Sequence, residues 1–218
     1  GTMPIPVTAG DDVAALTRVG SQLFFVSYES PDGPFDPLIT LRVVRPGASS
    51  SVFVSELPWC PDVTSTYTGC HVDCENEFCE ATYDMTAVGD LLYFVTTTDR
   101  LWRSDGTRAG TFKLMKLGGC NLVGGVPCAK SFTDVDGTLF FVTPRIVHSN
   151  ATDEDEFVAT ELWKSNGTEA GTVLVKSLYS LSNLTAVGTT LYFQGYSNNN
   201  AGYELWKSDG TDSGTVMV

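Results

Sequence analysis

The chain has only two histidines, His71 and His148. A Ser-His-Asp or Cys-His site would need one of them beside an activated nucleophile. Neither lies in a recognisable nucleophile motif such as Gly-x-Ser-x-Gly. We therefore interpret both as surface histidines and expect no catalytic residue. A carbohydrate hydrolase with paired carboxylates is the alternative, because the separation of such carboxylates is a property of the three-dimensional structure.

The cysteines are the next residues with distinctive chemistry, and they gather in two segments, residues 57–84 and 117–131. An even number of cysteines placed outside the predicted strands is typical of disulfides. We expect one bond across the second segment, whereas the first allows three connectivities. Zinc bound by the cysteines and His71 is the alternative, disfavoured because the usual two-residue spacing of cysteine pairs is missing. The predicted disulfide cysteines are Cys60, Cys70, Cys74, Cys79, Cys120 and Cys128.

Two polar segments could bind a ligand without catalysis. Residues 196–203 mix aromatic rings with amides, a combination suited to sugar hydroxyls or a polar protein surface. Residues 153–156 are a run of carboxylates, in which Asp153 and Asp155 could bind calcium through hard oxygen ligands. The run lacks the spaced Asp-x-Asp-x-Asp-Gly pattern of a dedicated loop, so a solvated acidic loop is preferred and no other cofactor is expected. The predicted ligand-binding residues are Tyr196, Asn198, Asn199, Asn200 and Tyr203.

A repeated phrase defines the elements that must position these segments. Glu-Leu-Trp-Lys-Ser-Asp-Gly-Thr begins at Glu204, and close copies begin at Glu161 and Arg100. Each copy predicts a hairpin, because apolar strands flank a turn rich in Asp, Gly and Thr. Asp105 and Asp209 are expected to accept hydrogen bonds from the turn backbone.

The tryptophans of this phrase, Trp102, Trp163 and Trp206, recur at one strand position. Fixed tryptophans of this kind are typical of packing between sheets, and we assign them a structural role together with Asp105 and Asp209. A platform on which sugars stack is the alternative interpretation.

A second phrase, again strand, tight turn and strand, occurs four times. The two phrases together make a four-stranded repeat of about 45–55 residues, the signature of a propeller blade. Runs such as Leu-Phe-Phe-Val are continuously apolar, as expected for a sheet covered on both faces. The second phrase occupies residues 16–26, 85–95, 132–142 and 184–194.

We therefore predict an all-β fold, a β-propeller of four four-stranded blades that closes alone or forms part of a larger propeller. Residues 1–15 precede it, and we expect them to hold the remnant of an expression tag and a strand that could help to close the ring. A second chain could also complete the ring, so a monomer or a dimer is expected. The predicted blades span approximately residues 16–57, 85–117, 132–178 and 184–218.

The repeated phrase resembles the ELWxxDGT repeat family, found in large secreted or surface-anchored bacterial proteins. The resemblance covers residues 16–218 and is weakest in the first repeat. There residues 40–44 replace the Glu-Leu-Trp strand, and residues 45–51 replace the Asp-Gly-Thr turn. What the resemblance implies is a repeat scaffold outside the cell, with no known reaction.

The formal net charge of −13 and the pI near 4.4 argue against nucleic acid or an anionic membrane as partner. No sequence run is long and apolar enough for a membrane span. In an up-and-down blade the variable loops collect on one face, where binding residues tend to lie. We predict a secreted, non-catalytic binding module, lectin-like or protein-binding, whose partner is a glycan or a surface protein in adhesion or surface assembly. A structural spacer is a further alternative.

Overall fold

The structure is a computed structural model that describes residues 12–29, 38–57, 85–96, 100–117, 129–149, 154–197 and 202–218. These ranges contain sixteen strands and no helix. The strands form four separate four-stranded antiparallel sheets. The all-β prediction and the prediction of four four-stranded repeats are therefore confirmed. Their arrangement as a propeller stays a prediction.

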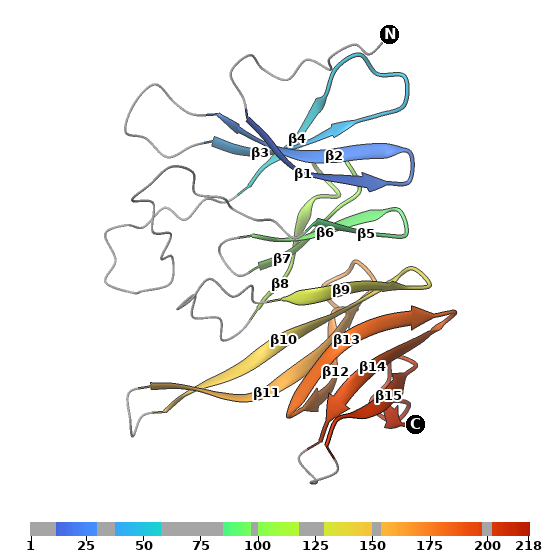
Figure 1. The fold of residues 1–218 in the computed structure, drawn as a ribbon. Helices are drawn as coiled ribbons and strands as arrows, with labels where there is room; N and C mark the ends of the chain where they lie inside the picture. Colours follow the sequence, from blue (N-terminus) through green and yellow to red (C-terminus); the bar gives the residue numbers. More distant parts are fainter. Residues whose placement is uncertain are drawn as a thin grey trace. The chain divides into compact units, whose positions relative to one another are not determined.

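Each sheet is a simple meander, in which strands that follow one another in sequence are hydrogen-bonded neighbours (Figure 1). The first sheet consists of β1 (Asp12–Val19), β2 (Gln22–Glu29), β3 (Leu38–Val44) and β4 (Val52–Glu56). The second consists of β5 (Met85–Val88), β6 (Leu91–Thr96), β7 (Arg100–Ser104) and β8 (Phe112–Lys116). The third consists of β9 (Lys130–Val135), β10 (Thr138–Ser149), β11 (Glu154–Ser165) and β12 (Val173–Leu178). The fourth consists of β13 (Ser180–Val187), β14 (Thr190–Tyr196), β15 (Glu204–Ser208) and β16 (Val216–Met217).

A bulge recurs in the first strand of three sheets, and the sequence analysis did not predict it. Ala15, Ser131 and Asn183 each lie four residues before the valine that ends the strand, and their φ angles are 52°, 59° and 58°. The strand register shifts at each of these positions. The strands continue beyond the bulge toward their N-terminal ends, so β1 begins at Asp12 and β13 at Ser180. A bulge interrupts the alternation that marks a strand in the sequence, which is why the repeated phrase underestimated these strands.

The hairpin formed by β10 and β11 is longer than the repeated phrases indicate. The two phrases of the third repeat leave residues 143–160 between them, but the pairing of the two strands continues through this segment to Ser149 and Glu154. Pro144 is tolerated in β10 because the neighbouring strand β9 pairs only as far as Val142, so β10 has a single partner there. In Figure 1 this hairpin projects beyond the other strands of its sheet.

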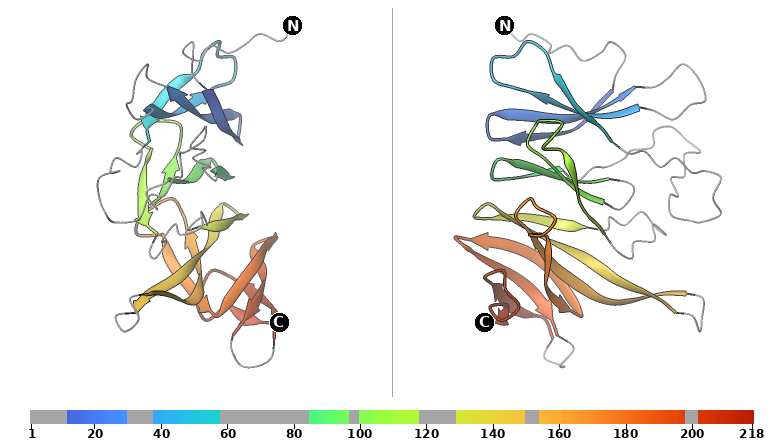
Figure 2. Two further views of the ribbon diagram at one scale, coloured as in Figure 1. Left: turned by 60° about the vertical axis from the view of Figure 1, so that its left-hand side comes forward. Right: turned by 180° about the vertical axis from the view of Figure 1, so that it is seen from behind.

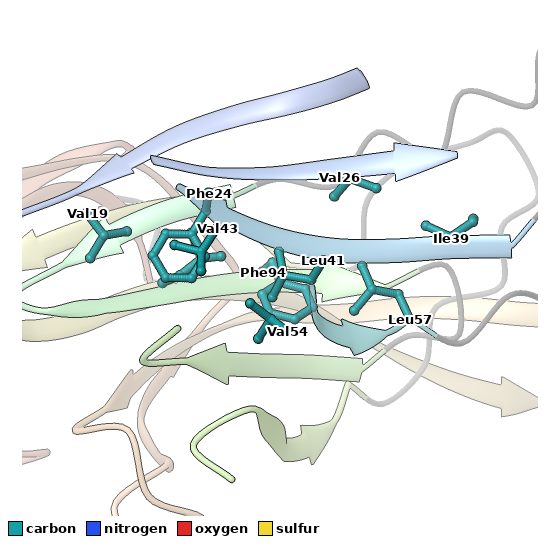
Figure 3. Packing of buried hydrophobic residues seen from close by; sticks show 10 residues of the cluster. Val19, Phe24, Val26, Ile39, Leu41, Val43, Val54, Leu57 and Phe94 are labelled. Atoms are coloured by element: carbon teal, nitrogen blue, oxygen red, sulfur yellow. The ribbon is translucent and has the colours of Figure 1, made fainter. Parts of the chain in front are cut away.

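The chain divides into two compact units, residues 1–113 and residues 114–218, with the boundary inside β8. In the first unit the inward faces of β2, β3 and β4 pack against β6 (Figure 3). Phe24, Leu41 and Val54 meet Leu92 and Phe94 in this core, and each is at most 1% exposed. Thr17 adds a hydrogen bond from its Oγ1 to the carbonyl of Met85, at 3.2 Å.

The second unit repeats this arrangement with the third and fourth sheets, which lie side by side in both views of Figure 2. Phe140, Val142 and Leu162 of the third sheet pack against Phe193 and Trp206 of the fourth. Phe140 holds the same place in the repeated phrase as Phe24 in the first unit. The same sheet-to-sheet packing thus occurs once in each unit.

Candidate functional site

Each tryptophan of the repeated phrase stacks on a phenylalanine of the neighbouring strand. The cross-strand partners are Phe94 with Trp102, Phe141 with Trp163 and Phe193 with Trp206. Their ring centroids lie 6.2, 6.4 and 6.2 Å apart, with interplanar angles of 15°, 18° and 17°. In the degenerate first sheet the partner of Phe25 is Arg42 instead.

The indole nitrogens differ between the copies. Trp163 Nε1 donates to Thr143 Oγ1 at 3.1 Å and to Glu161 Oε2 at 3.2 Å. Trp206 is 8% exposed, and its Nε1 has no hydrogen-bond partner among the described residues. Gly195 occupies the strand position that Thr143 holds in the third sheet. Trp206 therefore lies in the core of the second unit, and its packing is the dominant interaction of the ring.

The Ser-Asp-Gly-Thr turn is held by its own side chains, as the copy in the fourth sheet illustrates. Thr215 Oγ1 donates to the carbonyl of Thr211 at 2.6 Å, so its only proton is used there. Ser208 must then donate the 2.7 Å hydrogen bond between the hydroxyls of Ser208 and Thr215. Ser208 Oγ in turn accepts from the amide of Gly210 at 3.0 Å. Ser208 and Thr215 are both buried, so this framework satisfies groups that water does not reach.

The carboxylate of the turn completes the framework. Asp209 Oδ1 accepts from the amide of Thr211 at 2.8 Å and from its Oγ1 at 2.7 Å. Thr211 Oγ1 accepts from the amide of Gly214 at 2.9 Å. A Cβ on Gly214 would collide with the Asp209 carboxylate, which explains why this glycine recurs. Asn166 makes the corresponding bonds in the copy of the third sheet, so the position requires an acceptor oxygen and not a charge.

These bonds change the acidity of the two aspartates. The pKa of Asp209 is lowered by the hydrogen bonds from the Thr211 hydroxyl and amide, against a small opposing effect of burial. For Asp105 burial raises the pKa most, but the hydrogen bonds from Thr107 and the charge of Arg103 together lower it below the ordinary value. The hydrogen bonds of the turn therefore keep both carboxylates ionised. Together with the hydrogen bonds described above, this assigns the recurring polar residues a role in stabilising the scaffold.

Within each unit a turn also contacts the neighbouring sheet. Arg45 Nη2 donates to the carbonyl of Gly106 at 2.9 Å in the first unit. A Cβ on Gly106 would lie 3.2 Å from Phe24 Cζ, and a Cβ on Gly210 would lie 3.2 Å from Phe140 Cζ. In the second unit Lys176 Nζ forms a 2.8 Å salt bridge with Asp212 Oδ1. The repeated turns are thus part of the packing between sheets, which leaves them little freedom to bind a ligand.

The residues that do not recur form a different surface, a row of four contacting aromatic rings in the second unit. We call Phe157, Tyr179, Tyr196 and Tyr203 the aromatic row. Neighbouring rings along it have centroids 6.4, 5.4 and 5.7 Å apart. Phe157, Tyr179 and Tyr203 are 48%, 50% and 58% exposed. Large aromatic side chains that contact one another and are still half in water mark a candidate binding surface.

The meander topology brings these four rings to one end of the sheets. Phe157 lies near the start of β11, Tyr179 links β12 to β13, Tyr196 ends β14, and Tyr203 immediately precedes β15. Every second connection of a meander lies at the same end of its sheet. Tyr179 joins the end of the third sheet at which β11 begins to the end of the fourth sheet at which β14 ends and β15 begins. The hydroxyl of Tyr203 also donates a hydrogen bond to Oγ of Ser180, the first residue of β13, at 3.4 Å.

Two of the predicted ligand-binding residues, Tyr196 and Tyr203, lie in the aromatic row. Asn198, Asn199 and Asn200 lie outside the described residues. The prediction missed Phe157 and Tyr179, although the sequence holds a signal for Tyr179. The residues that follow the corresponding leucines in the first two repeats are Pro58 and Gly118, so this aromatic is specific to the third repeat.

The remaining predicted sites fall largely beyond what the structure describes. All six cysteines, His71 and Asp153 lie outside the described residues, so the disulfide and zinc alternatives stay predictions. His148 and Asp155 are opposite each other in the pairing of β10 with β11, where only the backbone is described. Among the residues with described side chains, no group of three or more His, Cys, Asp or Glu is placed to hold a metal ion.

The part of the chain that the structure describes holds no helix capable of spanning a lipid bilayer. Neither a scan against protein-family models nor a search of the curated proteins gives a match. The resemblance to the ELWxxDGT repeat family therefore rests on the repeated phrase alone.

Proposed function

We propose that this chain is a non-catalytic extracellular binding module, lectin-like or protein-binding, that serves adhesion or surface assembly. The observation that carries the proposal is the aromatic row, because its four rings contact one another and three of them are about half exposed, on a scaffold whose recurring residues are occupied by packing. Aromatic side chains supply large contact area at low conformational cost, which is why they dominate recognition surfaces.

The scaffold is proposed to be a β-propeller, closed alone or as part of a larger ring. Four consecutive meanders and the repeated face-to-face packing of sheets within each unit support this arrangement. In a propeller the connections that carry the aromatic row would belong to the face with the variable loops. That face is where a binding surface can vary without disturbing the blades.

The proposed location is outside the cell, supported by the resemblance of the repeated phrase and by the even number of cysteines. Three intramolecular disulfides, one of them between Cys120 and Cys128, are part of the proposal. Peptide mapping under non-reducing conditions should find these bonds. Free thiols with stoichiometric zinc would contradict this part of the proposal.

The binding function is tested by presenting the purified chain to a broad glycan array, with and without calcium, and to isolated surface proteins. Specific binding that Tyr203→Ala abolishes would support the proposal. Release of a cleaved product from any glycan would contradict the non-catalytic assignment and favour the hydrolase. Binding that survives loss of the Tyr203 ring would show that the aromatic row is not the recognition surface.

A further inference from the structure

A cavity of the second unit lies beside Trp163, away from the aromatic row. Its volume is about 340 Å³, near the lower end of the range of about 300–1,000 Å³ that small-molecule sites cover. All of its lining residues belong to the second unit, because the two that come from β8 follow the boundary inside that strand. The lining includes Met115 and Lys116 of β8, Arg145 and Ile146 of β10, and Glu161 and Trp163 of β11.

The packing between the third and fourth sheets shows why a cavity remains at Trp163. There Gly195 leaves room for the indole of Trp206, which fills the space together with Leu178. In the third sheet the position of Gly195 is held by Thr143, whose hydroxyl accepts a hydrogen bond from Nε1 of Trp163. Trp163 is not a member of either hydrophobic core described above, and it is only partly buried. Its indole therefore forms a wall of the cavity and does not fill it.

The charges that line the cavity have the opposite balance to those of the chain as a whole. Lys116 and Arg145 are both exposed, and neither has a hydrogen bond or an ion pair to any residue that the structure describes. The acidic residue of the lining is Glu161, whose Oε2 accepts a hydrogen bond from Nε1 of Trp163 at 3.2 Å. The lining thus carries a net positive charge in a chain whose net charge is −13. This local excess favours an anionic ligand.

The other groups of the lining suit a sugar ring. The indole of Trp163 and the side chains of Met115 and Ile146 offer an apolar surface to the C–H groups of such a ring. A carboxylate has several acceptor sites, so Glu161 can accept hydrogen bonds from sugar hydroxyls in addition to the one from Trp163. The planar guanidinium of Arg145 matches the geometry of a carboxylate, to which it can donate two parallel hydrogen bonds.

We infer that this cavity binds a saccharide unit that carries a carboxylate, such as a uronic acid. The sugar ring packs on Trp163, the carboxylate pairs with Arg145 and Lys116, and the hydroxyls donate to Glu161. Of the three recurring tryptophans only Trp163 lines the cavity, so the role of a sugar platform is inferred for this copy alone. The inference adds a second site to the proposed binding module and does not involve the aromatic row.

The test titrates trigalacturonic acid into the whole chain by isothermal titration calorimetry. Two control compounds separate its features: the trimethyl ester has the same rings without the charges, and tricarballylic acid has three carboxylates without the rings. We expect trigalacturonic acid to bind and each control compound to bind at least roughly tenfold more weakly. Added salt should weaken the binding, because Lys116 and Arg145 are exposed.

Arg145→Ala should weaken the binding of trigalacturonic acid roughly tenfold or more, the usual effect of losing a charge-assisted hydrogen bond. Arg145→Lys should cause a smaller loss, because lysine keeps the charge but not the planar pair of donors. The matched control variant is Lys207→Ala, which removes an exposed positive charge of β15 that does not line the cavity. It should bind as the unmodified chain does. All three variants should keep their unfolding midpoints, because both side chains are exposed.

The outcomes distinguish this inference from the proposed function. Binding of trigalacturonic acid should depend on Arg145 and not on Tyr203, whereas a glycan or protein bound by the aromatic row should depend on Tyr203 and not on Arg145. If tricarballylic acid binds as tightly as trigalacturonic acid, the saccharide assignment is wrong. If Arg145→Ala and Lys207→Ala bind trigalacturonic acid equally well, the cavity is not its site and the inference is overturned. If trigalacturonic acid does not bind while Tyr203→Ala abolishes the binding of another ligand, the inference fails and the proposed function stands.

Discussion

Gly195 and Trp206 are fitted to each other in the fourth sheet. A Cβ on Gly195 would lie 2.7 Å from Cδ1 and 2.9 Å from Nε1 of the Trp206 indole, and 2.9 Å from Cδ1 of Leu178. The glycine leaves the space into which the indole packs, and Trp206 is buried there against the third sheet. In the third sheet the position of Gly195 is held by Thr143, whose hydroxyl accepts a hydrogen bond from Nε1 of Trp163.

This fit predicts that Gly195→Ala destabilises the second unit by about 1–3 kcal/mol, the usual cost of overpacking a core. Urea unfolding followed by tryptophan fluorescence measures the change. Trp206→Phe should relieve the added Cβ, so the double variant should be less destabilised than the two single changes added together. Strictly additive effects would show that the two residues do not compete for the same space.

A second prediction concerns the glycine at the end of the repeated turn. Gly214→Ala places a Cβ where the Asp209 carboxylate accepts its hydrogen bonds, so the turn must open. We expect a loss of about 1–3 kcal/mol in the free energy of unfolding. Ser213→Ala, one residue earlier and exposed, should change it by less than about 0.5 kcal/mol. Equal effects of the two changes would contradict the role assigned to Gly214.

The ionised turn aspartates predict a dependence of stability on pH. A carboxyl whose pKa is lowered on folding contributes stability above its unfolded pKa, about 3.9, and loses it as pH falls through the lower folded value. The double variant Asp105→Asn and Asp209→Asn keeps the acceptor oxygens, as Asn166 does naturally, but cannot titrate. We expect it to be less stable than the unmodified chain at pH 7.

The difference should disappear in acid. Between about pH 5 and pH 2 the unmodified chain should lose more stability than the double variant, until the two coincide. Unfolding monitored at a series of pH values measures both curves. If the free energy of unfolding of the two proteins falls in parallel over this range, the charges of the two carboxylates do not contribute to stability.

The salt bridge between Lys176 and Asp212 is expected to contribute little. Its side chains are 26% and 77% exposed, so water screens the attraction between their charges. Lys176→Ala should lower the free energy of unfolding by at most about 1 kcal/mol, and less at high salt. A larger loss that persists in high salt would show that the aliphatic part of Lys176 is what packs against the turn of the fourth sheet.

The sequence by itself determined the number of sheets and the internal structure of the turns. The recurring Ser, Asp, Gly and Thr interact within a few residues of one another, so their roles follow from local geometry that each copy repeats. The sixteen strands likewise follow from local apolar runs and turn signals. The bulge at Ala15 was not predicted, because a bulge interrupts the two-residue alternation of side chains by which a strand is recognised in a sequence.

Only the tertiary structure brought the aromatic row together. Phe157 and Tyr203 are far apart in the sequence, and no repeated pattern marks either of them. They share one surface because a meander returns its connections to the same end of each sheet and because the link at Tyr179 is short. Contacts of this kind depend on how whole sheets are joined and packed, and a local pattern of residue types does not encode them.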